Sequence, residues 1–155
     1  MIKKLIAIVF FNIILLQPAT LNASELIKSN NIDEIVKIAR NYGSATKTVQ
    51  PNGNPKIIGK IDNIPFSIRF RNCKSVEQCQ DMNFRVGFMI KPSLDVINEW
   101  NRNKRFSKAY LDETGDVILE WDIIIYGGLT SENLDKNLSY WRLTLTQFTK
   151  HIGFK

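Results

Sequence analysis

Two stretches of alternating apolar and polar residues, joined by a loop with a cysteine at each end, constrain the fold of this chain most. Apolar side chains occupy every second position over residues 64–71, and the same pattern returns over residues 84–90. A period of two residues is typical of a β-strand with one buried face. The loop from Cys73 to Cys79 therefore connects two strands that we expect to be neighbours.

Short turns place further strands beside these two. Residues 62–63 are Asp-Asn, which tolerates left-handed backbone and predicts a two-residue hairpin after a strand at 56–61. A second hairpin is predicted from strands at 107–112 and 117–126, and residues 46–49 read as a weak strand. Hairpin connections of this length make the predicted sheet antiparallel.

Three helices are predicted, and the first two begin after the cap residues Asn31 and Ser93. The first follows Asn31, three residues before Glu34, which resembles a capping box. The second follows Ser93, a good N-cap residue. We expect its apolar side chains to face the core: Leu94, Ile97 and Trp100.

The last helix follows a glycine pair at 127–128 and is capped by Thr130 or Ser131. Apolar side chains then recur every three or four residues over 134–152, as in a helix with one buried stripe. The element order is α-β-β-β(-β)-α-β-β-α. The sequence therefore predicts an α+β fold with an antiparallel sheet and helices, and not a doubly wound parallel sheet.

Residues 1–23 have the composition of a secretory signal peptide, with a basic start, an apolar run over 5–16 and small residues before Ser24. The run is short of the roughly 20 residues that span a bilayer. We expect cleavage between Ala23 and Ser24, leaving residues 24–155 as one periplasmic or secreted domain without a membrane span. An uncleaved leader, which would tether a regulator to the membrane, is the alternative.

Cys73 and Cys79 are the only cysteines. In an oxidising compartment such a local pair is most simply a disulfide, which for so small a loop contributes about 2 kcal/mol. A structural zinc site needs four ligands, and His151 is the only histidine. Redox pairs normally have two residues between the cysteines. We predict a structural disulfide, with no metal and no cofactor.

The formal net charge is +6, and Lys3 and Lys4 would leave with the leader. A basic balance can indicate nucleic acid, but an exported protein meets little of it. We therefore expect a mildly cationic surface and no nucleic-acid partner. The element order and the missing catalytic set favour instead a protein or peptide partner in the cell envelope.

Trp100, Arg102 and Arg105 are candidates for partner binding, because tryptophan and arginine are enriched at binding hot spots. The alternative is that Trp100 packs in the core while the arginines complement the negative end of the helix.

A second candidate is a cationic sheet face. Arg69, Arg71 and Arg85 fall on the polar side of two adjacent predicted strands, with Lys108 nearby. Such a face suits an acidic peptide or an anionic surface. The alternative is an ordinary solvated face.

Four carboxylates surround the second hairpin: Asp112, Asp116, Glu120 and Asp122. They could serve a small hydrolase or a weak calcium site, although no EF-hand spacing is present. Strand alternation sends Glu120 and Asp122 to the solvent face, and His151 lies alone in the last helical turn. With no catalytic constellation evident, we predict a non-enzymatic protein and keep the hydrolase as the alternative.

Several strings resemble the YbjN family of bacterial proteins. The most distinctive is Ile-Asn-Glu-Trp-Asn-Arg at 97–102, followed by matches at 105–106 and 110–112, and the resemblance extends over residues 35–148. Further matching positions are Gly115-Asp116, Leu119-Glu120, Gly127-Gly128, Trp141 and Phe148. The cysteines and residues 84–88 are similar to a secreted branch of that family. The resemblance implies a fold like that of type III secretion chaperones and a role as a sensory-transduction regulator. It carries over no catalytic residue, and it makes a homodimer a candidate assembly.

Overall fold

The computed structural model describes residues 25–154. The predicted leader, residues 1–23, and the predicted cleavage site between Ala23 and Ser24 lie outside the described residues. Within residues 25–154, no helix is both long enough and apolar enough to cross a membrane.

Six antiparallel strands form one sheet in the order β1-β2-β3-β4-β6-β5. The strands are β1 (Gly43–Val49), β2 (Pro55–Ile61), β3 (Ile64–Arg71), β4 (Asp81–Phe88), β5 (Lys108–Leu111) and β6 (Val117–Ile124). The helices are α1 (Ile32–Ala39), α2 (Leu94–Asn103) and α3 (Ser131–His151), with a 3₁₀ turn at Arg40–Tyr42. The predicted α+β class is confirmed, with four strands preceding α2. The likeness to secretion chaperones stays a prediction.

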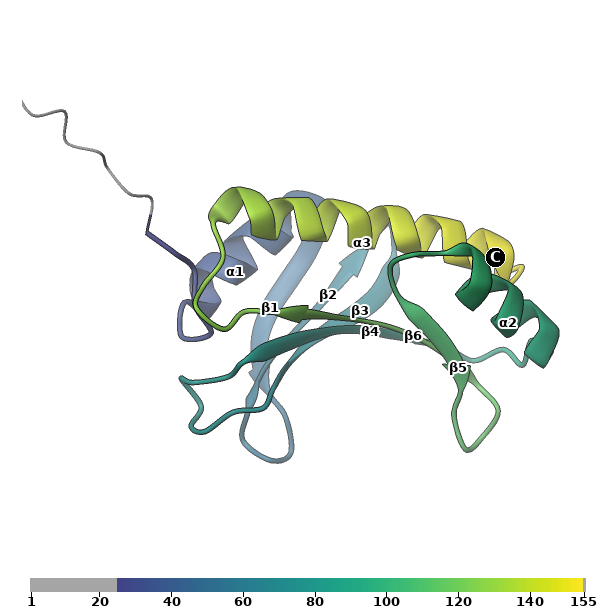
Figure 1. The fold of residues 1–155 in the computed structure, drawn as a ribbon, viewed down its shortest axis with the longest axis horizontal. Coiled ribbons are helices and arrows are strands. Elements are labelled where there is room, and N and C mark those ends of the chain that lie inside the picture. The colour runs from purple at the N-terminus through teal and green to yellow at the C-terminus, as the bar shows by residue number, and fades with distance from the viewer. Residues whose placement is uncertain (1–24, 155) are drawn as a thin grey trace, which may run out of the picture.

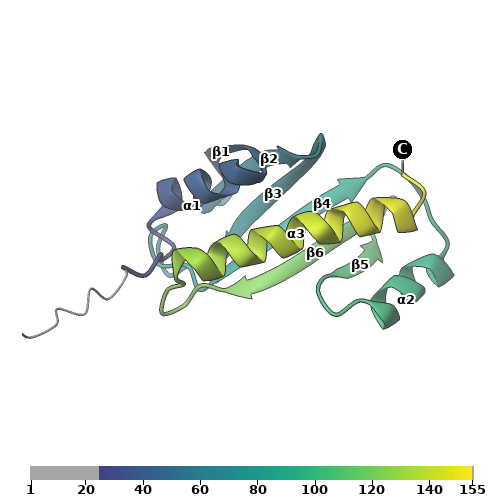
Figure 2. The ribbon, with the colours of Figure 1, turned by 90° about the horizontal axis from the view of Figure 1, so that it is seen from above.

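The helices lie on one side of the sheet (Figure 1). Helix α3 runs along the sheet, with α1 beside its beginning and α2 beside its end (Figure 2). The opposite side of the sheet carries no helix within the described residues (Figure 1). We call this side the open face.

The core lies between the sheet and α3. Strand side chains of alternate positions meet the apolar stripe of α3, as the two periodicities predict. The ring of Trp141 lies 5.6 Å from that of Phe84, and the ring of Phe148 lies 5.7 Å from that of Phe88. All four side chains are buried, and burial of a large apolar side chain stabilises the fold by about 1.5 to 3 kcal/mol.

The predicted turn and two of the predicted caps are present. Asp62 and Asn63 have φ angles of 49° and 65°, the left-handed conformation that a two-residue hairpin requires. The Ser93 hydroxyl accepts a hydrogen bond from the Val96 amide at 3.5 Å. The Thr130 hydroxyl accepts one from the Asn133 amide at 3.1 Å, so Thr130 and not Ser131 caps α3.

Two local expectations are wrong. The Asn31 side chain accepts from the preceding Lys28 amide at 2.8 Å, so it closes the turn before α1 and makes no capping box. Leu94 is 64% exposed instead of facing the core. It is the first residue of α2, and the buried contacts of this helix begin one turn later, at Ile97 and Trp100.

Candidate partner-binding face

Strand register fixes which side chains reach the open face. Phe66, Ile68 and Phe70 of β3 point to the core, so the residues between them point the other way. The charged side chains on the open face are Lys56, Lys60, Arg69, Arg71, Asp81, Arg85, Lys108, Glu120 and Asp122. The structure therefore brings the predicted arginines of β3 and β4 onto one face.

Positive charge gathers on one half of the open face. Strands β1, β2 and β3 place Lys56, Lys60, Arg69 and Arg71 there and contribute no carboxylate. The carboxylates of this face lie on β4 and β6. Within residues 25–154, no ion pair involves these four cations.

A hollow of about 520 Å³ lies in this cationic half. Lys56, Lys60, Arg69 and Arg85 supply its charged lining, and Ile58, which is 44% exposed, supplies apolar surface. An apolar centre with a polar rim is the usual arrangement of a protein–protein interface. Lys56 and Lys60 are not evident as members of this face from the sequence, because Ile57 and Ile58 interrupt the alternation there.

Arg69 is held in an unfavourable electrostatic position. Partial burial, and then the positive charges of Arg85 and Arg71, lower the pKa of the Arg69 guanidinium below its usual value. A negative group bound beside Arg69 would relieve this repulsion.

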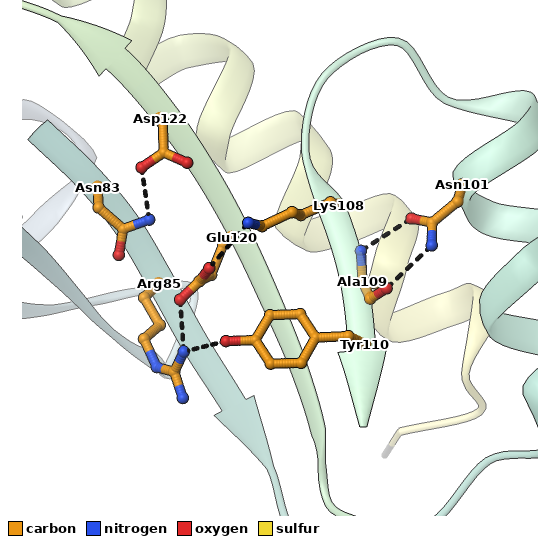
Figure 3. A network of polar contacts seen from close by, with 8 residues as sticks. All are labelled: Asn83, Arg85, Asn101, Lys108, Ala109, Tyr110, Glu120 and Asp122. Atoms are coloured by element: carbon orange, nitrogen blue, oxygen red, sulfur yellow. Dashed lines mark hydrogen bonds and ion pairs between the residues drawn. The ribbon is translucent and has the colours of Figure 1, made fainter. Parts of the chain in front are cut away.

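The other half of the open face is neutralised by a buried carboxylate (Figure 3). Glu120 is 6% exposed and accepts a hydrogen bond from Arg85 on the neighbouring strand. The Lys108 ammonium lies 3.6 Å from its other oxygen, and the Arg85 guanidinium also donates to the Tyr110 hydroxyl. The expectation that Glu120 is a solvated carboxylate is therefore wrong, because side chains from both neighbouring strands cover it.

This network moves the pKa values of both partners. Burial favours the neutral carboxyl of Glu120, but the hydrogen bond and positive charge of Arg85 outweigh it, so the pKa of Glu120 is lowered. Burial likewise disfavours the charged guanidinium of Arg85, but the hydrogen bonds that it donates to Glu120 and Tyr110 raise its pKa. Both groups therefore carry their charges at neutral pH.

Asn83 lies at the boundary between the two halves. It is 1% exposed, and its amide donates to the Asp122 carboxylate at 2.8 Å. Its carbonyl oxygen is buried and has no hydrogen-bond partner among the described residues. The burial of Asn83 could not be predicted from the sequence, because it depends on side chains from adjacent strands.

Nearly all of the described residues match a known protein family. A family model named YbjN, described as "Putative bacterial sensory transduction regulator", matches residues 31–154. The chain belongs to the YbjN family. No curated protein and no solved structure matches it.

The candidates for binding on and after α2 of this YbjN chain are one buried and two exposed residues: Trp100, Arg102 and Arg105. Trp100 is 1% exposed, its indole N–H donates to the Ser107 hydroxyl, and its ring packs against Phe148 at 4.8 Å. The core alternative for Trp100 therefore fits the structure. Arg102 and Arg105 are exposed, but they lie on α2 and the loop after it, away from the open face.

In this YbjN chain the four carboxylates of the β5–β6 hairpin do not converge on one pocket. Asp112 accepts hydrogen bonds from the Thr114 amide and hydroxyl and from the Asp116 amide, so it organises the β5–β6 turn. The Thr114 hydroxyl contributes most to lowering the pKa of Asp112. Glu120 and Asp122 are held separately by Arg85 and Asn83. Within residues 25–154, no cluster of acidic, histidine or cysteine side chains could hold a metal ion.

The cysteine pair links the end of β3 to the beginning of β4. The sulfur atoms of Cys73 and Cys79 lie 2.09 Å apart, the distance of a disulfide bond. The Cys79 amide donates to the Ser29 hydroxyl at 3.0 Å, and that hydroxyl donates to the Glu77 carbonyl at 2.9 Å. The loop therefore also holds the segment that precedes α1.

Proposed function

We propose that this YbjN chain is an exported, non-enzymatic regulatory domain that binds an acidic protein or peptide segment on its open face. The observation that carries the proposal is a group of four cations on the open face that form no ion pair within residues 25–154: Lys56, Lys60, Arg69 and Arg71. The first three of them line the hollow. Carboxylates bound there would form charge-assisted hydrogen bonds, which are stronger than neutral ones. Their attraction would also speed the encounter with the partner.

The lining of the hollow suggests a partner that is acidic and partly apolar. Ile58 and Pro65 present apolar surface between the cations, and both are exposed. An apolar side chain placed on them would bury surface that now faces water. A segment that alternates carboxylates with β-branched residues matches this lining.

The carboxylates of the β5–β6 hairpin do not favour the hydrolase alternative. A general acid near neutral pH needs a raised pKa, whereas the pKa values of Asp112 and Glu120 are lowered. Their oxygens are already engaged by Thr114 and Arg85. These carboxylates therefore support a structural role.

Export rests on the composition of residues 1–23 and on the local pair Cys73 and Cys79. Retention of the leader would place the same open face on a membrane-tethered regulator.

Charge reversal tests the proposal. The variant Lys56→Glu/Arg69→Glu/Arg71→Glu changes the cationic half and leaves Arg85 in its network. The control Arg102→Glu/Lys136→Glu/Lys150→Glu makes the same change of net charge at exposed helix-side positions. The probe is a fluorescein-labelled peptide of four Glu-Val repeats, followed by fluorescence anisotropy.

We expect the open-face variant to bind the peptide at least about tenfold more weakly, while the control stays within about twofold of the parent chain. Equal losses in both variants would mean attraction by net charge alone. Unchanged binding in the open-face variant would remove the proposal. If the open-face variant loses binding as expected, photo-crosslinking in the cell envelope from position Ser67, on the open face, identifies the natural partner.

A further inference from the structure

The two edge strands of the sheet, β5 and β1, differ in whether their outward backbone groups have hydrogen-bond partners. At the β5 edge, the Asn101 side chain donates to the Ala109 carbonyl at 2.9 Å and accepts from the Ala109 amide at 2.8 Å. These two bonds occupy the outward backbone groups in the middle of a four-residue strand. Helix α2 therefore closes the β5 edge. The β1 edge, at the other end of the sheet, pairs with no strand within residues 25–154.

Two observations show which residues of β1 point away from the sheet. Val49 lies opposite Pro55, which has no N–H, and the Gln50 amide of the next pair donates to the Asn54 carbonyl at 2.8 Å, so alternation turns the backbone groups of Val49 outward. The Ala45 carbonyl accepts a hydrogen bond from the Arg40 side chain at 3.0 Å, outside the sheet. Alternation then gives Lys47 the same outward orientation.

The outward groups of Lys47 and Val49 are available for pairing. Both residues are exposed, Val49 by 67%, and neither backbone bonds to another segment within residues 25–154. An unpaired row of this kind is a template for an added strand. Among residues 43–49, which form β1, Lys47 is the one charged residue, and its ammonium forms an ion pair with Asp33 of α1.

The free edge is continuous with the hollow. Ser44 and Thr46 of β1 line the hollow together with Lys56 and Lys60 of β2. An added strand would lie about 4.8 Å from β1, and every second side chain would point to the open face. Those side chains would lie within reach of the lysines of β2, because a lysine side chain is long and flexible.

We infer that the β1 edge takes an extended acidic segment of a partner protein as a seventh strand of the sheet. The segment pairs with the outward backbone groups of Lys47 and Val49, and its alternate carboxylates face Lys56 and Lys60. This inference rests on the proposed function, because the same acidic partner occupies the edge and the hollow. A second copy of the chain fits less well as the occupant. Pairing of two β1 strands would bring Lys47 and the lysines of β2 of one copy close to the same lysines of the other copy, and like charges repel.

Paired substitutions at the edge test the strand pairing. Lys47→Pro removes an outward N–H without touching the β1–β2 ladder, and Lys47→Ala removes the same side chain but keeps the N–H. Val49→Pro and Val49→Ala form a second matched pair. The probe is the peptide of four Glu-Val repeats, and a peptide of four Glu-Pro repeats carries the same charge with half of the N–H groups.

We expect each proline variant to bind the Glu-Val peptide about fivefold to tenfold more weakly than its alanine counterpart, since one backbone hydrogen bond is lost. The Glu-Pro peptide should bind the parent chain weakly. Hydrogen exchange of the parent chain should slow at the Lys47 and Val49 amides when the Glu-Val peptide is added. This last measurement needs no variant and keeps the inference testable if a proline variant fails to fold.

The outcomes separate the two proposals. Equal binding by the proline and alanine variants, with loss in the open-face charge reversal, would overturn the strand pairing and leave the proposed function standing. Loss in the proline variants, with none in the charge reversal, would remove the proposed function and the acidic partner with it. A dimer in light scattering that Lys47→Pro converts to a monomer would show that a second copy occupies the edge, which overturns the inference.

Discussion

The side chain of Asn101 hydrogen-bonds both backbone groups of Ala109, at 2.9 Å from its amide nitrogen and 2.8 Å from its oxygen. A carboxamide carries the same donor and acceptor as a peptide group, so Asn101 imitates a neighbouring strand. Asn101 belongs to the string at 97–102 that carries the most distinctive part of the family resemblance. In that string, Trp100 fills the core and Asn101 closes the sheet, so both have structural roles.

We expect Asn101→Ala to lower the free energy of unfolding by about 1 to 2 kcal/mol, because two hydrogen bonds to the backbone of β5 are lost. The freed edge should also promote association at high concentration. Urea denaturation and light scattering measure the two effects. Asn98→Ala, at an exposed position of the same helix, is the matched control. Equal effects of the two substitutions would contradict the role of Asn101.

Acid should weaken the fold through Glu120. Its pKa is lower in the folded chain than in the unfolded chain, so the unfolded chain binds more protons in mildly acidic solution. The resulting stabilisation is present above the unfolded pKa and is lost as the pH falls through the folded pKa. Glu120→Gln should be less stable at neutral pH by about 2 to 3 kcal/mol, because Arg85 loses its charged partner.

Urea denaturation between pH 7 and pH 3 measures this effect. The stability of Glu120→Gln should depend less on pH than that of the parent chain. Glu113→Gln removes a charge of the same sign from an exposed turn position and should leave the slope nearly unchanged. A slope unaltered by Glu120→Gln would mean that other carboxylates govern acid unfolding.

Local periodicity predicted most of the secondary structure. The strands at 64–71 and 84–88 and the stripe of α3 follow from spacings of two and of three to four residues. The burial of Glu120 and Asn83 could not be predicted, because it depends on which strands become neighbours. Strand β4 pairs with β6 and not with β5, so Arg85 meets Glu120 across a pairing that spans α2.

The candidate site was predicted in part for the same reason. Alternation along single strands placed Arg69, Arg71 and Arg85 on one face, and the structure agrees. It did not distinguish Arg85, which a carboxylate neutralises, from Arg69, which has no ion pair among the described residues. That difference arises between strands, so a one-dimensional pattern does not contain it.

Cleavage of the leader is a separate prediction. We expect the chain isolated from the cell envelope to begin at Ser24, because residues 1–23 have the order of regions that signal peptidase recognises. Intact mass and sequencing of the amino-terminal peptide measure this directly. Ala23→Glu should block cleavage, since the enzyme requires a small residue before the cut. A parent chain that keeps residues 1–23 would instead favour the membrane-tethered regulator.

The disulfide should stabilise more than its own loop. Replacing both cysteines by serine should lower the free energy of unfolding by about 2 kcal/mol through the entropy of the unfolded chain. The Cys79 amide also donates to Ser29, and Ile27, two residues before it, exchanges backbone hydrogen bonds with Leu129 at 2.7 and 2.8 Å. A mobile cysteine loop should therefore loosen the amino-terminal segment, and hydrogen exchange should become faster at Ile27.

A double-mutant cycle measures this coupling. Ser29→Ala alone should cost about 1 to 2 kcal/mol, because it leaves the buried Cys79 amide without an acceptor. In the chain without cysteines the same substitution should cost less, since the loop can then turn that amide to water. Ser75→Ala, exposed in the loop, serves as the control. Fully additive losses would show that Ser29 and the disulfide act independently.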